Sequence, residues 1–255
     1  MNVVETLPLF PAVAELVAHY ACRTGGASAA PFASLNLGFS TTDDAALVVE
    51  NRLRLARALD APLERWVVAG QVHGAEVARV TTADCGEGSR ATSQRLRGHD
   101  AVLLAEPGVF ALALSADCPL VVLADVPARR AGVAHAGWRG TALGVIEALV
   151  AAMEREGSRP SALAASISPG IGGCCYEVGE EVFSALAQRT EVEPARRGRR
   201  LDLRMAQRAI LRAAGIDASA IQVHTDCNCC QPDRYFSHRR DAGRTGRNGA
   251  VVGWR

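Results

Sequence analysis

A thiol and an imidazole lie near the two ends of residues 116–140, whose sequence is ADCPLVVLADVPARRAGVAHAGWRG. Cys118 precedes an apolar run that ends at Asp125, and a turn containing Pro127 leads into a second apolar run that ends at His135. Because the two runs are predicted to be paired strands, the Cys118 thiol and the His135 imidazole are expected near the same end of a hairpin. Sulfur and imidazole nitrogen are zinc ligands, and a thiolate beside an imidazole is also a nucleophile and base.

A further candidate is His73, which lies in the sequence QVHG between two predicted strand runs in residues 66–80. A catalytic zinc usually takes three protein ligands and leaves one position for water, whose pKa falls to roughly 7. His73, Cys118 and His135 all lie at predicted strand ends or turns, so a His₂Cys zinc site is one hypothesis. In the rival hypothesis, Cys118 is a nucleophile and His135 is its base, without a metal. One sulfur cannot serve both purposes.

The elements that must position these residues predict a single α/β domain over residues 1–255 with a mixed sheet. Strand runs are paired in the first half of the chain and alternate with helices in the second half. Helices are predicted over residues 45–60, from Thr141 as N-cap to a stop at Gly157, and over residues 203–214. Further strands are predicted over residues 16–22, 66–71, 75–80, 101–105, 109–115, 162–168, 221–225 and 250–254.

The composition excludes several classes of protein. The chain has 255 residues, enough for a sizeable core, and no apolar run of membrane-spanning length. Its net charge of +1 argues against a nucleic acid partner bound by charge alone. Residues 1–5 carry no basic signal-peptide region, so a cytoplasmic location without membrane contact is expected. All 28 basic residues are arginine, which excludes a Schiff-base or phosphate-loop lysine.

Eight cysteines are present, and in a cytoplasmic protein they are expected to be free thiols, packed residues or metal ligands rather than disulfides. The adjacent pair Cys174-Cys175 and the cluster CNCC at residues 227–230, which contains Cys227, Cys229 and Cys230, show no standard zinc-finger spacing. These cysteines are therefore predicted to be small buried residues rather than ligands.

Several segments in order resemble the YfiH-like family, also called the laccase-domain or multicopper polyphenol oxidoreductase family. The similarity covers about residues 23–247, and its segments are RTGG, SLNLG, QVHG, SADCPLVVLAD, AHAGWRG, SPGIGGCCYEVG, FSHRRD and TGR. The resemblance implies an α/β sandwich related to the catalytic domain of cytotoxic necrotising factor toxins. It implies a zinc ion held by His73, Cys118 and His135. It also implies phosphorolysis of adenosine, inosine or methylthioadenosine and deamination of adenosine.

The alternative activities that the family names suggest can be compared with the residues present. A multicopper oxidase needs around ten histidines in ligand positions, and this chain has six in total. A conventional polyphenol oxidase is therefore a less favoured alternative, and copper is an alternative metal at a His₂Cys site. The usual zinc deaminase signature, H-x-E with P-C-x-x-C, is absent. A peptidoglycan-precursor editing amidohydrolase using Cys118 and His135 remains an alternative, as does a non-enzymatic metal-binding or interaction domain.

Phosphorolysis needs a cationic pocket for phosphate, and in a chain without lysine only arginine can provide bidentate positive charge. We predict Arg139 and Arg240 as phosphate or substrate ligands, because each lies in a segment that carries the resemblance. Asn36 and Gln71 are predicted to hydrogen-bond the base or ribose. No side chain is assigned to proton transfer; the predicted catalytic group is water on the zinc.

Overall fold

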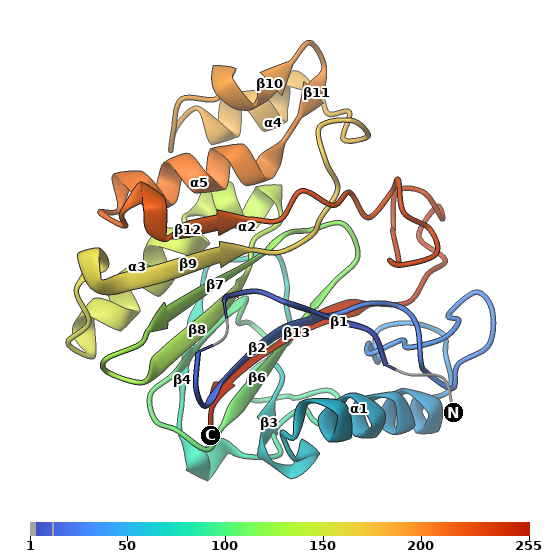
Figure 1. The fold of residues 1–255 in the computed structure, drawn as a ribbon. Helices are drawn as coiled ribbons and strands as arrows, with labels where there is room; N and C mark the ends of the chain where they lie inside the picture. The colour runs from blue at the N-terminus through green and yellow to red at the C-terminus, as the bar shows by residue number, and fades with distance from the viewer. Residues whose placement is uncertain (1–3, 12) are drawn as a thin grey trace.

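A computed structural model of the protein describes residues 4–11 and 13–255, which form two mixed β-sheets packed face to face (Figure 1). In spatial order, the five-stranded sheet contains β1 (Thr6–Pro8), β2 (Leu16–Ala21), β13 (Asn248–Trp254), β6 (Phe110–Ser115) and β3 (Trp66–Val67). In spatial order, the six-stranded sheet contains β12 (Ile221–Val223), β9 (Leu163–Ile167), β7 (Leu120–Asp125), β8 (Arg130–His135), β5 (Ala101–Leu104) and β4 (Val77–Val80). Each sheet has parallel and antiparallel pairs, which confirms the predicted mixed α/β sandwich.

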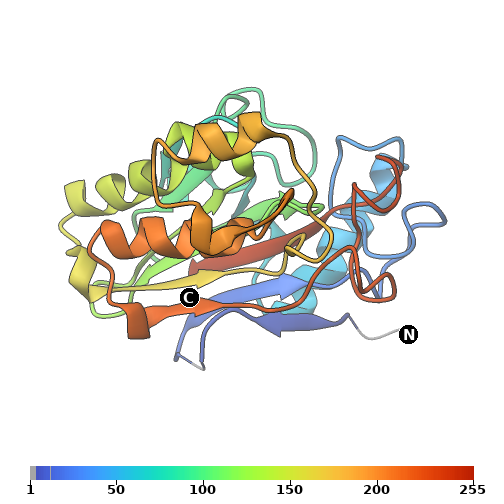
Figure 2. The ribbon, with the colours of Figure 1, turned by 90° about the horizontal axis from the view of Figure 1, so that it is seen from above.

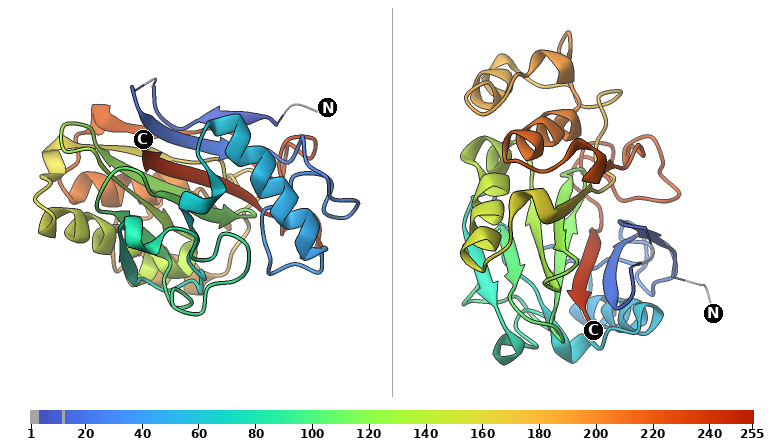
Figure 3. Two further views of the ribbon diagram at one scale, coloured as in Figure 1. Left: turned by 90° about the horizontal axis from the view of Figure 1, so that it is seen from below. Right: turned by 60° about the vertical axis from the view of Figure 1, so that its left-hand side comes forward.

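Helices cover the outer faces of both sheets. Helix α1 (Ala45–Leu59) packs on the five-stranded sheet, whereas α3 (Val145–Arg155) and α5 (Leu203–Ala213) pack side by side on the six-stranded sheet (Figures 2 and 3). Strand β7 is buried on both faces, because Val122 contacts the core between the sheets and Val121 contacts the core under the helices. A strand covered on both sides needs apolar residues at every position, which explains its uninterrupted apolar sequence.

The predicted hairpin is present as β7 and β8, whose antiparallel register pairs Leu120 with His135. Cys118 comes two residues before the start of β7, and His135 ends β8. The hairpin therefore brings the thiol and the imidazole to the same end, as the sequence indicated. Asp125 accepts a hydrogen bond from the Ala128 backbone N–H at 3.1 Å and stabilises the turn at the opposite end.

The helix predicted from Thr141 to Gly157 is divided in two, and Thr141 is not its N-cap. Helix α2 (Trp138–Leu143) begins after Gly137, and Gly144, with φ of +90°, separates it from α3. A left-handed residue cannot continue an α-helix, so the chain changes direction there. Thr141 lies inside α2, where its hydroxyl donates to the Ala136 carbonyl at 3.2 Å.

Aspartate side chains cap the N-termini of two other helices. Asp44 accepts from Ala46 N–H before α1, and Asp202 accepts from Arg204 N–H before α5. The arginine-rich segment at residues 191–201 contains a small hairpin. It is formed by β10 (Arg196–Arg197) and β11 (Arg200–Leu201) and lies near α4 (Glu180–Leu186). Among residues 4–11 and 13–255, no helix is long and apolar enough to cross a membrane.

Candidate metal centre

The three predicted metal ligands converge at one place. The ligand atoms of His73, Cys118 and His135 all lie within 4.8 Å of one another, and the two imidazole centroids are 4.9 Å apart with the rings inclined at 71°. In a tetrahedral zinc site, bonds of 2.0–2.3 Å place neighbouring ligand atoms about 3.3–3.6 Å apart. Small side-chain movements would therefore bring the three atoms onto one ion.

Close backbone packing makes this convergence feasible. His73 comes from the turn between β3 and β4, whereas the other two ligands belong to the β7–β8 hairpin. Gly137 separates the hairpin from α2, and a Cβ atom at this position would lie 2.8 Å from Cys118 Sγ and 3.3 Å from His73 Cδ2. Only glycine leaves room for the sulfur and the ring at this point.

A buried carboxylate, Asp100, organises both histidines. Its Oδ1 lies 3.0 Å from His135 Nδ1 and accepts the His73 backbone N–H at 2.8 Å. Its Oδ2 accepts the backbone N–H groups of Val72 at 2.9 Å and Gly74 at 2.7 Å. Since a carboxylate can only accept, the neutral form of His135 carries its proton on Nδ1 and has Nε2 free for a ligand. A metal-binding histidine commonly has this carboxylate partner, so the residues fit a bound metal ion.

Backbone strain is concentrated in the same region. Positive φ angles of 55°, 63° and 88° are found at Gln71, His73 and Asp117, and residues other than glycine rarely adopt such angles. Each such residue costs about 1–3 kcal/mol and persists only where the surrounding contacts hold it. The three hydrogen bonds from Val72, His73 and Gly74 to Asp100 hold the first of these turns.

The electrostatics of the site favour a thiolate. Burial tends to raise the pKa of Cys118, but the adjacent His135 and His73 lower it to about 6. Burial tends to lower the pKa of His135, but Cys118 and Asp100 raise it to about 9. In the protein without a metal, Cys118 and His135 thus form a thiolate–imidazolium pair at neutral pH. Such a thiolate can ligate a cation or act as a nucleophile.

The three candidate ligands line a cavity of about 570 Å³, which is in the size range of small-molecule sites. Two of the predicted substrate-binding residues, Gln71 and Arg139, also line it. The Arg139 guanidinium is exposed and lies 4.5 Å from the centre of the Trp138 ring. Gln71 Nε2 donates to the Leu114 carbonyl and Gln71 Oε1 accepts the Leu114 N–H, both at 2.7 Å, so this side chain holds the cavity wall in place.

The other two predicted substrate residues, Asn36 and Arg240, are not among the described residues that line this cavity. Asn36 is fully buried, and its Oδ1 accepts the backbone N–H of Arg247 at 2.9 Å. Arg240 forms a bidentate ion pair with Asp241, with both distances 2.8 Å, and donates to two backbone carbonyls. Their role as substrate ligands stays a prediction; in this structure both support neighbouring backbone.

Sequence reasoning missed several residues that the cavity brings together. Arg239 and Arg247 line it, although only the neighbouring Arg240 was selected. Asp117, for which the sequence suggested no role, is also buried at the cavity. Its Oδ2 accepts the Arg239 backbone N–H at 2.7 Å, and its Oδ1 has no hydrogen-bond partner in the described part of the chain. Burial raises its pKa. Arg247 stands in the TGR segment of the resemblance, whereas no local pattern signalled Asp100.

Comparison with known proteins gives consistent matches along nearly the whole chain. A family model described as multi-copper polyphenol oxidoreductase laccase matches residues 17–255. The chain is 41% identical over 253 residues to the purine nucleoside phosphorylase YlmD of Geobacillus stearothermophilus, which covers 96% of this chain and 92% of that protein. It is 35% identical over 228 residues to the adenosine deaminase RL5 of an unknown prokaryotic organism, covering 84% and 86% of the two chains.

Solved structures show the same fold. The crystal structure of YlmD from Geobacillus stearothermophilus matches with a TM-score of 0.93, 39% identity and 100% coverage of both chains. The crystal structure of the hypothetical protein YfiH from Bacillus licheniformis matches with a TM-score of 0.90 and 35% identity, covering 94% of this chain and 93% of that one. The predicted fold class is therefore confirmed by two experimental structures.

Proposed function

We propose that this chain, which belongs to the multi-copper polyphenol oxidoreductase laccase family, is a zinc-dependent purine nucleoside enzyme. Its proposed reactions are phosphorolysis of adenosine, inosine or methylthioadenosine, and deamination of adenosine. The observation that carries the proposal is the placement of His73, Cys118 and His135 in one arginine-lined cavity. The activities named in the similar proteins, a purine nucleoside phosphorylase and an adenosine deaminase, support it.

The residues suit zinc, because two imidazole nitrogens and one thiolate form a recognised catalytic donor set. A zinc ion there would supply Lewis acidity at the cavity wall. Asp100 would hold the His135 ring in the tautomer that presents Nε2. Copper is the alternative metal, because the same donors also bind it. Elemental analysis of the purified protein distinguishes the two metals.

Three arginines would bind the phosphate. Arg139, Arg239 and Arg247 line the cavity, and a guanidinium group pairs with phosphate through two parallel hydrogen bonds. The aromatic rings of Trp138 and Tyr176 also line the cavity and offer flat surfaces for a purine base. Cationic groups beside aromatic surfaces are what recognition of a nucleoside together with phosphate requires.

The test is an assay of purified, metal-replete protein on adenosine with and without phosphate, following inosine, hypoxanthine and adenine. We expect His73→Ala to lose more than about 100-fold in turnover, because a metal ligand matters at least as much as the groups that orient it. His19→Ala is the matched control, since His19 lies in β2 and contacts Thr6. The proposal fails if the metal-replete protein turns over none of these nucleosides, or if His73→Ala is fully active.

The arginine assignment has its own test. We expect Arg239→Ala to raise the KM for phosphate and to leave phosphate-independent deamination within about twofold, because only phosphorolysis uses the anion. Arg155→Ala, at the end of α3, serves as a control substitution outside the cavity. Equal loss of both activities in Arg239→Ala would show that the arginine has no selective role in phosphate binding.

One observation favours a second function. The Cys118 thiol, whose pKa is lowered to about 6 beside His135, has the properties of a cysteine nucleophile with its base. The chain would then be an amidohydrolase, with a peptidoglycan precursor as the substrate. Activity that survives complete chelation and is abolished by alkylation of Cys118 would favour this function over the zinc enzyme.

We also propose that residues 1–255 form one domain. Both sheets contribute side chains to a common core, and this continuity supports the proposal. A single cooperative unfolding transition followed by both tryptophan fluorescence and circular dichroism would be expected.

A further inference from the structure

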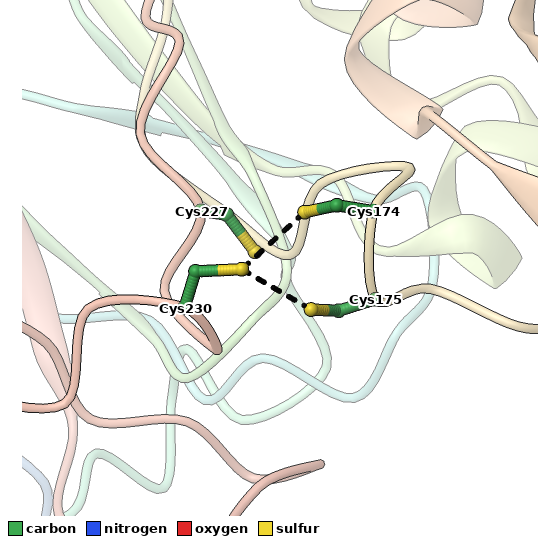
Figure 4. A group of neighbouring side chains, drawn as sticks. All are labelled: Cys174, Cys175, Cys227 and Cys230. Carbon is green, nitrogen blue, oxygen red and sulfur yellow. Dashed lines mark hydrogen bonds between the residues drawn. The ribbon is translucent and has the colours of Figure 1, made fainter.

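A second group of potential metal ligands lies outside the cavity. The sulfur atoms of Cys174, Cys175, Cys227 and Cys230 all lie within 4.8 Å of one another and point toward a common centre (Figure 4). Cys174 and Cys230 are exposed, so the prediction that these cysteines are small buried residues is wrong for both. Four thiols at one surface position call for another explanation than packing.

The distances between the sulfur atoms match one ion better than a disulfide. Cys230 Sγ lies 3.5 Å from Cys174 Sγ and 3.3 Å from Cys175 Sγ. A disulfide would require about 2.05 Å, whereas zinc–sulfur bonds of about 2.3 Å place the sulfurs of a tetrahedral site about 3.8 Å apart. A [4Fe–4S] cluster would separate the sulfurs further, because each of its four cysteines binds a different iron atom.

The backbone around the cysteines is arranged to hold two loops together. Cys174 and Cys175 lie in the glycine-rich loop after β9, and Cys227 and Cys230 lie in the loop after β12. Gly170 and Cys227 form a parallel β-bridge, and the Asn228 N–H donates to the Gly170 carbonyl at 3.0 Å. These contacts place both cysteine pairs without any contribution from the sulfur atoms.

Two features of these cysteines suit a metal site. The Gly172 backbone N–H donates to Cys227 Sγ at 3.2 Å, and such a donor stabilises a thiolate. In addition, Cys227 and Cys230 have the Cys-x₂-Cys spacing of structural zinc sites, which the intervening Cys229 concealed in the sequence.

Positive charge next to the group would offset the charge of four thiolates. Cys174 and Cys227 border a second cavity, of about 970 Å³, which arginine side chains also line: Arg197, Arg199, Arg200 and Arg204. Arg204 is buried, and its Nη1 donates at 2.8 Å to the carbonyls of His224 and Asp226, which immediately precede the Cys227 loop. Glu177 and Asp202 also line this cavity, and Asp202 pairs with Arg204 at 3.1 Å, so a site of charge −2 with zinc bound would lie beside a partly neutralised group of arginines.

We propose that Cys174, Cys175, Cys227 and Cys230 bind one Zn²⁺ ion in a closed structural site, separate from the candidate metal centre. Binding displaces one proton from each thiol, forms four zinc–sulfur bonds and leaves no position for water or substrate. The site therefore contributes stability rather than catalysis.

The proposed ion would stabilise the loop that forms one wall of the cavity at the candidate metal centre. Tyr176, which lines the cavity, directly follows Cys175. From the same loop, the Ile171 N–H donates to the Asp117 carbonyl at 2.8 Å, next to Cys118. Without the ion, only hydrogen bonds would join the two cysteine loops, and the position of Tyr176 would be less well fixed.

The experiment separates this site from the first by removing the first. In a His73→Ala/His135→Ala background, we expect elemental analysis to find about one zinc per chain. Adding Cys174→Ser and Cys230→Ser, which replace the two exposed cysteines of the group, should abolish zinc binding. Two controls should retain the zinc: Cys229→Ser in the same loop and Cys85→Ser elsewhere.

A second measurement uses the unaltered chain, so that the test does not depend on variants that fold. Refolded with Co²⁺, it should show the visible bands of four-sulfur tetrahedral coordination in addition to the spectrum of a His₂Cys centre. Four reactive thiols without bound metal would overturn the proposal. So would a disulfide, seen as a mass lower by two hydrogens, or zinc retained after both serine substitutions.

Discussion

Replacing Asp100 with asparagine tests how the candidate metal centre is organised. The carboxylate accepts four hydrogen bonds, two on each oxygen. An asparagine has one oxygen and one NH₂ group. In either orientation, its NH₂ group therefore faces two of the four hydrogen-bond donors. If NH₂ replaces Oδ2, it confronts the N–H groups of Val72 and Gly74. If it replaces Oδ1, it confronts the His73 N–H and the His135 Nδ1–H, and a neutral His135 would have to carry its proton on Nε2 instead.

The magnitude follows from these two orientations. Two unsatisfied donors cost at most about 2–6 kcal/mol in the free energy of unfolding of the metal-free protein, and less here because these N–H groups are only partly buried. In the second orientation, His135 loses its free Nε2 and cannot ligate a metal without rearrangement. Loss of the carboxylate partner of a metal-binding histidine typically weakens metal affinity by about 10–100-fold. Asp100→Asn should therefore reduce both stability and metal affinity.

Urea unfolding of the metal-free protein measures the first effect, and competition with a chromophoric chelator measures the second. Asp125→Asn is the matched control, because Asp125 is also buried but lies at the far end of the hairpin with a single bond to Ala128 N–H. It should leave metal affinity unchanged. An Asp100→Asn protein with wild-type stability and wild-type metal affinity would refute the reasoning.

The same group predicts a pH dependence. Burial opposes ionisation of Asp100, but the hydrogen bonds from His135 and from the Gly74 and Val72 backbone lower its pKa. Because the folded-state pKa is lowered, ionised Asp100 stabilises the folded protein at pH values above its unfolded-state pKa of about 3.9. This stabilisation is lost as the pH falls through the folded-state pKa. The metal-free wild type should thus lose stability more steeply in acid than Asp100→Asn, as measured by urea unfolding across pH.

Three further outcomes are expected. Gly137→Ala should weaken metal binding at least about tenfold, because its Cβ would lie 2.8 Å from Cys118 Sγ. Gly98→Ala is the control and should leave metal affinity unchanged, because a Cβ there meets nothing within 4 Å. Equal metal affinities in the two variants would contradict this. Iodoacetamide should alkylate Cys118 in the metal-free protein with an apparent pKa of about 6 and should spare it in the metal-bound protein, as peptide mapping would show. Leu149→Ala in the core should cost about 2–5 kcal/mol in urea unfolding, whereas exposed Leu143→Ala should cost under about 0.5 kcal/mol.

The parts of the fold that depend on local sequence were predictable. The hairpin that carries Cys118 and His135 is formed by adjacent strands, so its two apolar runs and the turn between them were enough to predict it. The helix after it was predicted as continuous because its apolar spacing continues past Gly144. The left-handed conformation of that glycine is set by tertiary packing, which no periodicity records.

The partners of the site were less accessible, because they come from distant elements. Asp100 reaches His135 across 35 positions of the chain, and its role depends on the pairing of β5 with β8. Asn36 was selected for its amide, yet the amide holds the backbone at Arg247, which is 211 positions away. Residue type and spacing thus indicated which groups could do chemistry, whereas the three-dimensional arrangement decided which of them face the cavity.

The position of β13 has a consequence for protein synthesis. This strand is the last of the described strands to leave the ribosome, yet it lies between β2 and β6. Until residue 254 has been translated, both neighbours have open edges that can pair with other chains. Arg247, which lines the cavity, directly precedes β13. A nascent chain interrupted before this point would lack both the central strand of the five-stranded sheet and part of the cavity lining.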